Sequence, residues 1–148
     1  MTDRAPAVRI LPMSTAEPSF RGRSIDDVQT WFFLAELPFA HRGEYHYVNQ
    51  GLAAEPGTVV LFQYDKRIVA AATLREAERF AGPRGGFAGV LRFFPESIRV
   101  FDPVDEADVR AAWPTFKRFN RVKQHLDPAR WPAFARRLTN VTAPPRSA

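Results

Sequence analysis

The segment GTVVLFQYDKRIVAAATL, residues 57–74, decides the fold of this chain. It holds two runs rich in β-branched and aromatic residues, 58–64 and 68–74, on either side of the polar residues 65–67. A short polar break between two such runs predicts a β-hairpin. Side chains alternate between the two faces of a strand, and both faces of the first run are mostly apolar. We therefore expect the hairpin to be buried on both sides, as in a closed barrel or a sheet covered by helices.

The second run of this hairpin carries three consecutive small residues, Ala70, Ala71 and Ala72, where a strand usually carries larger side chains. Two explanations are open. Either another backbone approaches the strand closely, or a recess opens in front of the alanines. The functional interpretation depends on which of the two the fold provides.

Length and composition limit the class of protein. A chain of 148 residues can form one domain with a substantial core. Its hydrophobic content of 45% and charged content of 25% are typical of a globular protein. The absence of cysteine excludes disulfides, a thiolate nucleophile and a cysteine-ligated zinc. No apolar run has the length of a membrane span and no signal peptide is recognisable, so we expect a cytoplasmic protein without membrane contacts.

The formal net charge is +5, and the excess lies in one segment. Residues 106–137 contain eight Lys or Arg and three acidic residues, while the rest of the chain is balanced. Such a basic segment is typical of a protein that binds a polyanion, and equally of a solvated helix face.

We expect three regions along the chain. Residues 1–23 are rich in Pro, Arg, Ser and Ala without any period, which predicts a flexible lead-in. Residues 24–138 form one domain, and the polar, Pro-rich residues 139–148 form a flexible tail.

A helix and a strand are predicted between the lead-in and the hairpin. Ser24 is a suitable N-cap for a broadly apolar helix that covers 25–37 and ends at Pro38. Residues 44–50 (EYHYVNQ) predict a strand. Its side chains on one face are Tyr45, Tyr47 and Asn49.

After the hairpin, the charged run 75–79 predicts that the chain leaves the sheet. A glycine-rich loop at 82–86 follows, and then two strands at 89–94 and 97–101, which are broken at Pro95. The glycine loop lacks the features of a phosphate-binding loop, and we interpret it as a connection that can form a lip over a pocket.

The C-terminal third is predicted to be helical. A first helix is capped by Asp105, and the pair Trp113 and Pro114 interrupts it. A second helix covers 114–126, with basic side chains on its outer face. Asp127 opens a third helix.

The order of these patterns resembles the PUA-like superfamily, and within it most of all the EVE domains, to which ASCH and YTH domains are related. In EVE domains a strand with a tyrosine and an asparagine precedes a glycine-led strand and an apolar return strand. The residues that match are Tyr45, Asn49, Gly57, Leu61, Phe62 and Tyr64. Thr58 replaces the family's aspartate, and an alanine replaces the glycine of the return strand. The resemblance spans residues 30–138, and its closing part is the segment LDPARWPAF.

The resemblance implies an α+β fold, namely a PUA-like mixed β pseudo-barrel of about five or six strands flanked by helices. Members of the superfamily hold one modified or flipped base at the barrel mouth. Stacking of a base on an aromatic side chain contributes about 1 to 3 kcal/mol, and polar groups read the edge of the base. We therefore expect a nucleic-acid-binding module that needs no cofactor. Its partners would be DNA or RNA and a nuclease or processing protein.

Site residues follow from the same resemblance, each with a plainer alternative. The residues expected to bind the base are Trp31, Tyr45, Tyr47, Asn49, Tyr64 and Ala71. The residues expected to contact phosphates are Arg84, Lys117, Arg118, Arg121 and Lys123. Aromatic residues with helical or strand spacing are commonly core residues, and surface cations commonly serve solubility.

Two further functions stay open. The chain could be a protein-interaction domain, or an accessory subunit of a nucleic-acid-processing or defence system, whose aromatic strand is plugged by side chains. A minor alternative is an RNA or nucleotide hydrolase. His41, Glu44 and His46 are metal-ligating residue types, but their placement across a turn and a strand does not support a metal site. With no serine elbow and no paired carboxylates, we expect neither catalytic residues nor a metal.

Overall fold

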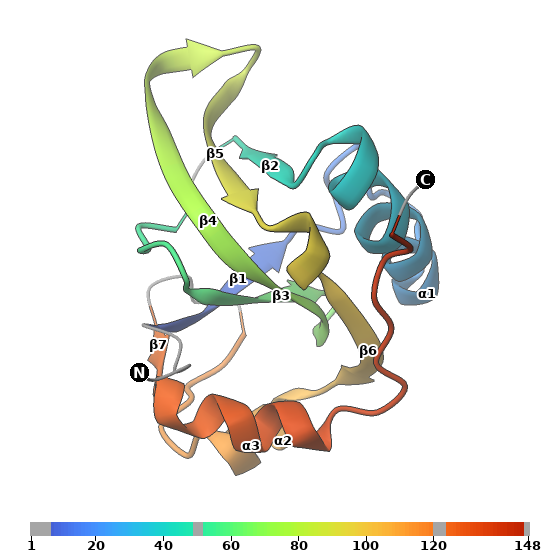
Figure 1. Cartoon of the computed structure of the whole chain (residues 1–148), viewed down its shortest axis with the longest axis vertical. Coiled ribbons are helices and arrows are strands. Elements are labelled where there is room, and N and C mark those ends of the chain that lie inside the picture. The colour runs from blue at the N-terminus through green and yellow to red at the C-terminus, as the bar shows by residue number, and fades with distance from the viewer. Residues whose placement is uncertain (1–6, 49–51, 120–123, 147–148) are drawn as a thin grey trace.

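A computed structural model of the chain describes residues 7–48, 52–119 and 124–146. The described elements form a mixed α+β fold in which short helices pack against a twisted sheet (Figure 1). The strands are β1 (Val8–Met13), β2 (Glu44–Tyr47), β3 (Val59–Tyr64), β4 (Arg67–Arg84), β5 (Phe87–Phe93), β6 (Arg99–Val104) and β7 (His125–Leu126). The helices are α1 (Ile25–Asp27), η1 (Val28–Ala40), η2 (Pro95–Ser97), α2 (Glu106–Ala112), η3 (Pro128–Arg130) and α3 (Trp131–Arg137).

The strands form one sheet with the order β2-β5-β4-β3-β1-β7, and β6 pairs with β4 beside this path. In the part of the chain that the structure describes, the sheet stays open, because β2 and β7 are the two ends of this path. The prediction of an α+β fold with flanking helices is confirmed. The expected closure into a pseudo-barrel is not.

The predicted hairpin at residues 57–74 is confirmed as β3 and the first half of β4. Its turn contains two residues rather than three, because Arg67 already pairs with Tyr64. Asp65 and Lys66 have positive φ angles of 48° and 65°, as a two-residue type I′ turn requires. All six residues of β3 are buried, so the sheet is covered on both faces here, as expected.

The prediction of a flexible lead-in is wrong for residues 8–13, which form β1 in the interior of the sheet. β1 runs parallel to β3 in register from Val8, opposite Val59, to Met13, opposite Tyr64. Arg9 is buried within this strand and donates hydrogen bonds to the carbonyls of Ala53 and Gln124. These bonds compensate the burial of the guanidinium, because arginine side chains are almost never buried without partners.

β4 is longer than predicted, because the charged run 75–79 does not leave the sheet but pairs with β5. The hairpin of β4 and β5 extends beyond the body of the protein (Figure 1). It turns at Gly85 and Gly86, which both have positive φ angles, so the predicted connection at 82–86 is confirmed for these two residues, while residues 82–84 belong to β4.

Ion pairs between strands explain how charged residues are accommodated in the projecting hairpin. Arg92 on β5 lies opposite Glu44 on β2 and Glu76 on β4. Its Nε atom is 3.0 Å from a carboxylate oxygen of Glu44, and its Nη1 atom is 3.1 Å from Glu76 and 3.0 Å from Glu78. One guanidinium therefore joins three strands.

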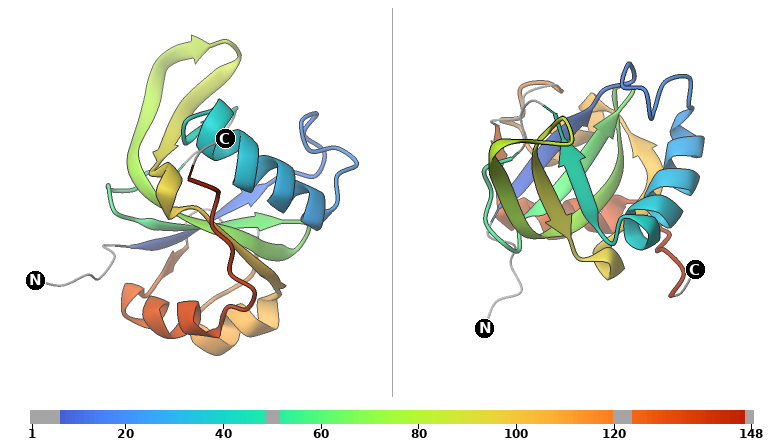
Figure 2. Two further views of the ribbon diagram at one scale, coloured as in Figure 1. Left: turned by 45° about the vertical axis from the view of Figure 1, so that its right-hand side comes forward. Right: turned by 90° about the horizontal axis from the view of Figure 1, so that it is seen from above.

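Two hydrophobic clusters lie on the two sides of the sheet. The upper cluster includes Phe33, Phe62 and Ala70 and is covered by η1. The lower cluster includes Ala71 and Phe101 and is covered by α2, α3 and the segment between them. The left view of Figure 2 shows this arrangement, with α1 and η1 above the sheet and α2 and α3 below it. Alternating side chains of β3 and β4 thus enter different clusters.

The first helix begins as predicted, because the Ser24 side chain accepts a hydrogen bond from the Asp27 backbone N–H. It does not end at Pro38. η1 continues to Ala40 with wider π-helical geometry, and the His41 N–H donates to the Glu36 carbonyl. This spacing accommodates a proline, which has no N–H, inside the helix.

The prediction of a second C-terminal helix over 114–126 is wrong. Residues 114–119 form neither a helix nor a strand, and β7 pairs antiparallel with β1. Phe116 and Phe119 are buried as the apolar pattern implied, but in an irregular segment. The caps at Asp105 and Asp127 are confirmed, since each side chain accepts a hydrogen bond from the backbone N–H of a following residue.

The predicted flexible tail is attached to the sheet over its described part, residues 139–146. Thr142 and Val100 exchange backbone hydrogen bonds of 2.9 and 2.8 Å. The Asp102 carboxylate accepts hydrogen bonds from Thr139 and Asn140. The tail thereby adds a short pairing partner to β6.

Candidate functional site

An aromatic pocket of about 430 Å³ lies between β2, the first helix and the loop that follows β1. Its lining residues are Glu17, Pro18, Ser19, Phe20, Arg23, Trp31, Phe32, His41, Glu44, Tyr45, His46 and Phe87. The pocket lies beside β2, at one end of the open sheet. Its size is in the usual range of small-ligand sites.

The loop between β1 and α1 forms one wall because Tyr64 holds it against the sheet. The Tyr64 hydroxyl lies 2.9 Å from the Phe20 carbonyl oxygen and 2.8 Å from that of Arg23. Phe20 is buried, with its ring edge-on to Phe32 at 5.2 Å. This packing fixes the position of Glu17 and Arg23 at the pocket.

Trp31 contributes the second aromatic surface. The guanidinium carbon of Arg23 lies over its ring, 3.7 Å from the centroid. Arg23 is also 3.0 Å from Asp27, one helical turn later. A guanidinium held over an indole presents a flat cationic surface, on which nucleobases stack in other proteins.

Tyr45 and Glu17 bring polar groups into the pocket. Burial raises the pKa of the Tyr45 hydroxyl strongly, and the charge of Glu17 raises that pKa further. Burial also raises the pKa of the Glu17 carboxyl. Within the described residues neither side chain makes a hydrogen bond or an ion pair. Both residues line the pocket.

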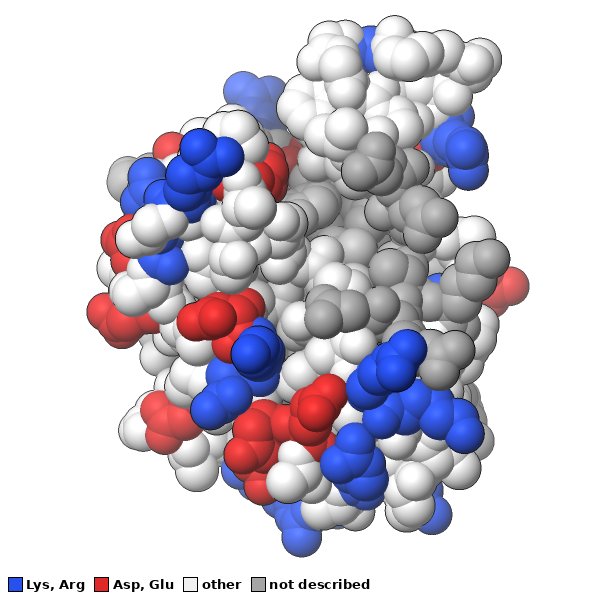
Figure 3. Space-filling view, turned by 180° about the vertical axis from the view of Figure 1, so that it is seen from behind, with Lys and Arg blue, Asp and Glu red and all other residues white. Residues whose placement is uncertain are grey.

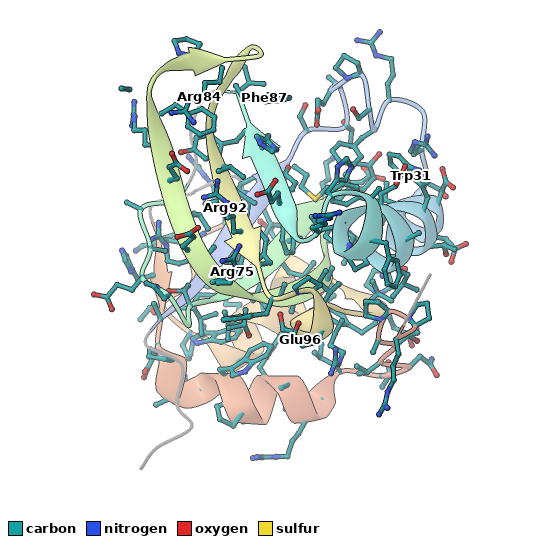
Figure 4. The ribbon with its side chains drawn as sticks, turned by 45° about the horizontal axis from the view of Figure 1, so that its top comes forward. Trp31, Arg75, Arg84, Phe87, Arg92 and Glu96 are labelled. Carbon is teal, nitrogen blue, oxygen red and sulfur yellow. The ribbon has the colours of Figure 1, made fainter. Side chains whose placement is uncertain are left out.

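The opposite wall comes from β2 and the tip of the projecting hairpin. The His46 ring lies 5.2 Å from that of Phe87 and 6.5 Å from that of Phe80. Arg84 pairs with Phe87 in the hairpin, and its guanidinium carbon is 4.5 Å from the Phe80 ring centroid. Figure 4 shows Arg84 and Phe87 together at the tip and Trp31 on the helix across β2.

Comparisons of this chain with models of known protein families, with curated proteins and with solved structures found no match.

Of the described residues expected to bind a base, the structure brings two together in the pocket, Trp31 and Tyr45. Tyr47 shares a face with Tyr45, but it does not line the pocket, and its ring covers Gly89 on β5. The assignment of Tyr64 to the base is wrong, because this side chain is buried and its hydroxyl bonds the loop backbone. Asn49 lies outside the described residues.

Ala71 is also wrongly assigned, because it faces the lower cluster, across the sheet from Trp31. It lines a separate apolar cavity of about 170 Å³ beside Trp131 and Phe101. Ala70 pairs with Phe62 on β3 and with Val100 on β6. The recess explanation holds for Ala71, because a small cavity opens before it.

The basic helix that was expected to contact phosphates does not form over its described part, residues 114–119. Lys117 and Arg118 lie in an irregular segment between Phe116 and Phe119, which pack below the sheet. Arg118 lines a shallow site together with Asp105 and Glu106. Figure 3 shows basic side chains next to acidic ones on the back of the molecule. Arg121 and Lys123 lie outside the described residues, so Arg84 alone of the proposed phosphate contacts is described near the pocket.

His41, Glu44 and His46 all line the aromatic pocket. Within residues 7–48, 52–119 and 124–146, no group of three or more His, Asp or Glu side chains is placed to hold a metal ion. Glu44 instead pairs with Arg92. In the same ranges, no helix is long and apolar enough to cross a membrane.

Sequence reasoning missed Glu17, Phe20 and Arg23, which all lie in the supposed lead-in. It also missed Phe87, which follows the Gly85–Gly86 turn. One signal was available in the sequence: Phe20 is a large apolar residue in an otherwise polar stretch. A residue of this type in a loop often anchors the loop to the core.

Proposed function

We propose that this protein is a nucleic-acid-binding module that holds one base in the aromatic pocket. The pocket composition supports the proposal: rings from a loop, a helix and two strands line it, together with Glu17 and Tyr45, whose polar groups make no hydrogen bond to another described residue. A planar, polar-edged ligand fits both features, because its faces stack on rings while its edge forms hydrogen bonds. DNA and RNA both supply such a ligand.

The cations that would meet the phosphates are Arg23 and Arg84, rather than the C-terminal residues. Arg23 lines the pocket, and Arg84 lies opposite Phe87 at the tip of the hairpin. The two therefore stand on the two sides of the pocket, where a strand with one base inserted would pass. Such contacts contribute affinity that falls with salt and does not depend on sequence.

We further propose that the fold is a PUA-like pseudo-barrel that is open beside β2. Support comes from the position of the aromatic pocket at the open end of the sheet, next to the strand that bears Tyr45. In the resemblance to EVE domains, the base occupies the barrel mouth near this strand.

A binding titration tests the base-binding proposal. Short single-stranded DNA and RNA oligonucleotides, with and without modified bases, are titrated at low and high salt. Trp31→Ala should weaken binding by about tenfold or more, because stacking on an aromatic ring is lost. The matched control is Trp131→Ala, which removes a half-buried indole below the sheet. Equal affinity of the two variants would contradict the proposal.

A protein-interaction domain without base binding is the second candidate. One observation favours it: Arg23 already covers one face of Trp31, and the Tyr45 ring packs against Phe32 and Phe62 at 6.0 Å. Side chains of the protein thus fill part of the aromatic surface. Negligible affinity for every oligonucleotide at low salt would favour this candidate over the first.

A further inference from the structure

The outer part of the β4–β5 hairpin is a thin ribbon without acidic residues. We call residues 79–89 the distal arm, which begins where Arg79 lies opposite Gly89 and turns at Gly85 and Gly86. Six of its eleven residues are Gly or Ala, so side chains add little to the thickness of the ribbon. Its charged residues are Arg79 and Arg84. Figures 1 and 2 show that the hairpin extends beyond the body of the protein.

Both arginines of the distal arm are accessible to a partner. Arg79 is exposed and makes no hydrogen bond or ion pair to another described residue. The guanidinium carbon of Arg84 lies over the Phe80 ring, and its Nη1 atom is 3.9 Å from the Glu78 carboxylate, but 68% of the Arg84 side chain is exposed. An ion pair with this exposure is weak. Glu78, the closest acidic residue along β4, is held more tightly by Arg92, at 3.0 Å.

A ribbon of this shape fits the major groove of B-form DNA. That groove is about 12 Å wide and admits a two-stranded β-ribbon, whose strands lie about 4.8 Å apart. The minor groove, about 6 Å wide, is too narrow for such a ribbon. The major groove of A-form RNA is deep and narrow, and side chains do not read it. Shape and charge of the distal arm therefore both favour duplex DNA.

We propose that the distal arm enters the major groove of duplex DNA, where Arg79 and Arg84 contact the phosphates. Phe87 belongs to the arm and also lines the aromatic pocket, and Figure 4 shows it beside Arg84 at the tip. A duplex held by the arm therefore lies next to the pocket. This inference rests on the proposed nucleic-acid binding and names the form of the nucleic acid.

The test compares duplex DNA, duplex RNA and single-stranded DNA of one sequence by fluorescence anisotropy at several salt concentrations. Duplex DNA should bind about tenfold more tightly than the other two, because the arm enters a groove in the DNA duplex alone. Equal affinity for the three would contradict the proposal.

A double variant tests the two cations. Arg79→Ala with Arg84→Ala should weaken duplex binding about tenfold and lower the slope of log affinity against log salt by about two units, since two phosphate contacts are lost. The matched control is Arg136→Ala with Arg137→Ala, which removes two exposed cations from α3 and should leave both quantities unchanged. Thermal unfolding verifies that both double variants are folded.

Methylation of the duplex by dimethyl sulfate locates the arm. The reagent attacks guanine N7, which lies in the major groove, and adenine N3, which lies in the minor groove. The protein should protect N7 and leave N3 reactive, and the variant without Arg79 and Arg84 should lose this protection. Protection of N3 alone, or of neither atom, would overturn the placement of the arm.

The outcomes separate this inference from base binding. If oligonucleotides bind in a Trp31-dependent way, but duplex DNA binds no more tightly than single strands or the arginine variant binds it as well as the unmutated protein, the role of the arm is overturned and base binding stands. If no nucleic acid binds at low salt, base binding is overturned, and the role of the arm with it.

Discussion

The guanidinium carbon of Arg23 lies 3.7 Å from the centroid of the Trp31 ring, and the same side chain forms an ion pair with Asp27 at 3.0 Å. This arrangement orients a cation and an aromatic surface toward one pocket. Arg23 comes from the loop before α1, which the Tyr64 hydroxyl bonds through the Arg23 carbonyl, and Trp31 comes from η1.

Arg23→Ala should weaken oligonucleotide binding and reduce its dependence on salt, because one cation near the phosphates is removed. The slope of log affinity against log salt should decrease by about one unit. Titrations at several salt concentrations measure this slope. Arg136→Ala, which removes an exposed cation from α3, is the control and should leave it unchanged. An unchanged slope in Arg23→Ala would exclude a phosphate contact of Arg23.

Glu17→Gln should stabilise the protein at neutral pH. Burial raises the pKa of Glu17 above its unfolded value, so the folded state holds the proton more tightly than the unfolded state. The ionised carboxylate therefore costs stability above the raised pKa, and this cost disappears as the pH falls below the ordinary carboxyl range. The melting temperature of Glu17→Gln should exceed that of the unmutated protein at pH 7, and the difference should vanish in acid.

The control for this pH series is Glu55→Gln, because Glu55 is exposed. Its melting temperature should follow that of the unmutated protein throughout. A loss at pH 7 would mean that the carboxylate is stabilised in the folded state, and a pH-independent gain would mean that burial does not raise the pKa of Glu17.

Tyr64→Phe should lower the free energy of unfolding by about 1 to 3 kcal/mol, because it removes the hydroxyl donor that the carbonyls of Phe20 and Arg23 share. The loop that carries Glu17 would then be held less tightly, so oligonucleotide binding should weaken as well. Urea unfolding measures the first effect. Tyr47→Phe is the control, and a similar loss in both variants would show that the hydroxyl bonds of Tyr64 are not what holds the loop.

Gly89→Ala should also destabilise the protein, by about 1 to 3 kcal/mol. A Cβ atom at this position would collide with the Tyr47 ring and with the Glu78 carbonyl oxygen. Gly82→Ala provides the control, since no atom lies within 4 Å of the Cβ position there. Urea unfolding should show a loss for Gly89→Ala only. Equal free energies of unfolding for Gly89→Ala and Gly82→Ala would mean that Tyr47 moves aside without a loss of stability.

The local patterns predicted the elements that depend on neighbouring residues. The hairpin at 57–74 followed from two apolar runs and a polar turn, and it forms because contacts of this kind span only a few residues. Ser24, Asp105 and Asp127 were recognised as caps because each side chain bonds a backbone N–H two or three residues later.

Elements that depend on distant partners were missed. β1 contains Arg9 and Pro12, which are unfavourable in a strand, and it forms because β3 pairs with it about fifty positions later. The run 75–79 reads as a solvated loop, yet Arg92 compensates the acidic side chains around it from β5. The apolar spacing of Phe116 and Phe119 fits a helix, but the same burial is reached in an irregular segment.

The candidate site likewise contains some residues that the sequence identified and some that it did not. Trp31 and Tyr45 were identified from the sequence as members of an aromatic set, and the pocket contains both. Glu17, the residue with the most distinctive chemistry there, was not identified. No local pattern marks it, and its carboxylate reaches the pocket only because Tyr64 holds a loop more than forty residues earlier in the chain.

The sequence by itself determined the strands and helix starts of the hydrophobic segments, because side-chain alternation and capping act over a few residues. The sequence also determined which aromatic and cationic side chains are present. The tertiary structure alone decided which of them meet. Packing on two sides of one sheet separates Trp31 and Tyr45 from Ala71, since successive residues of a strand face opposite layers.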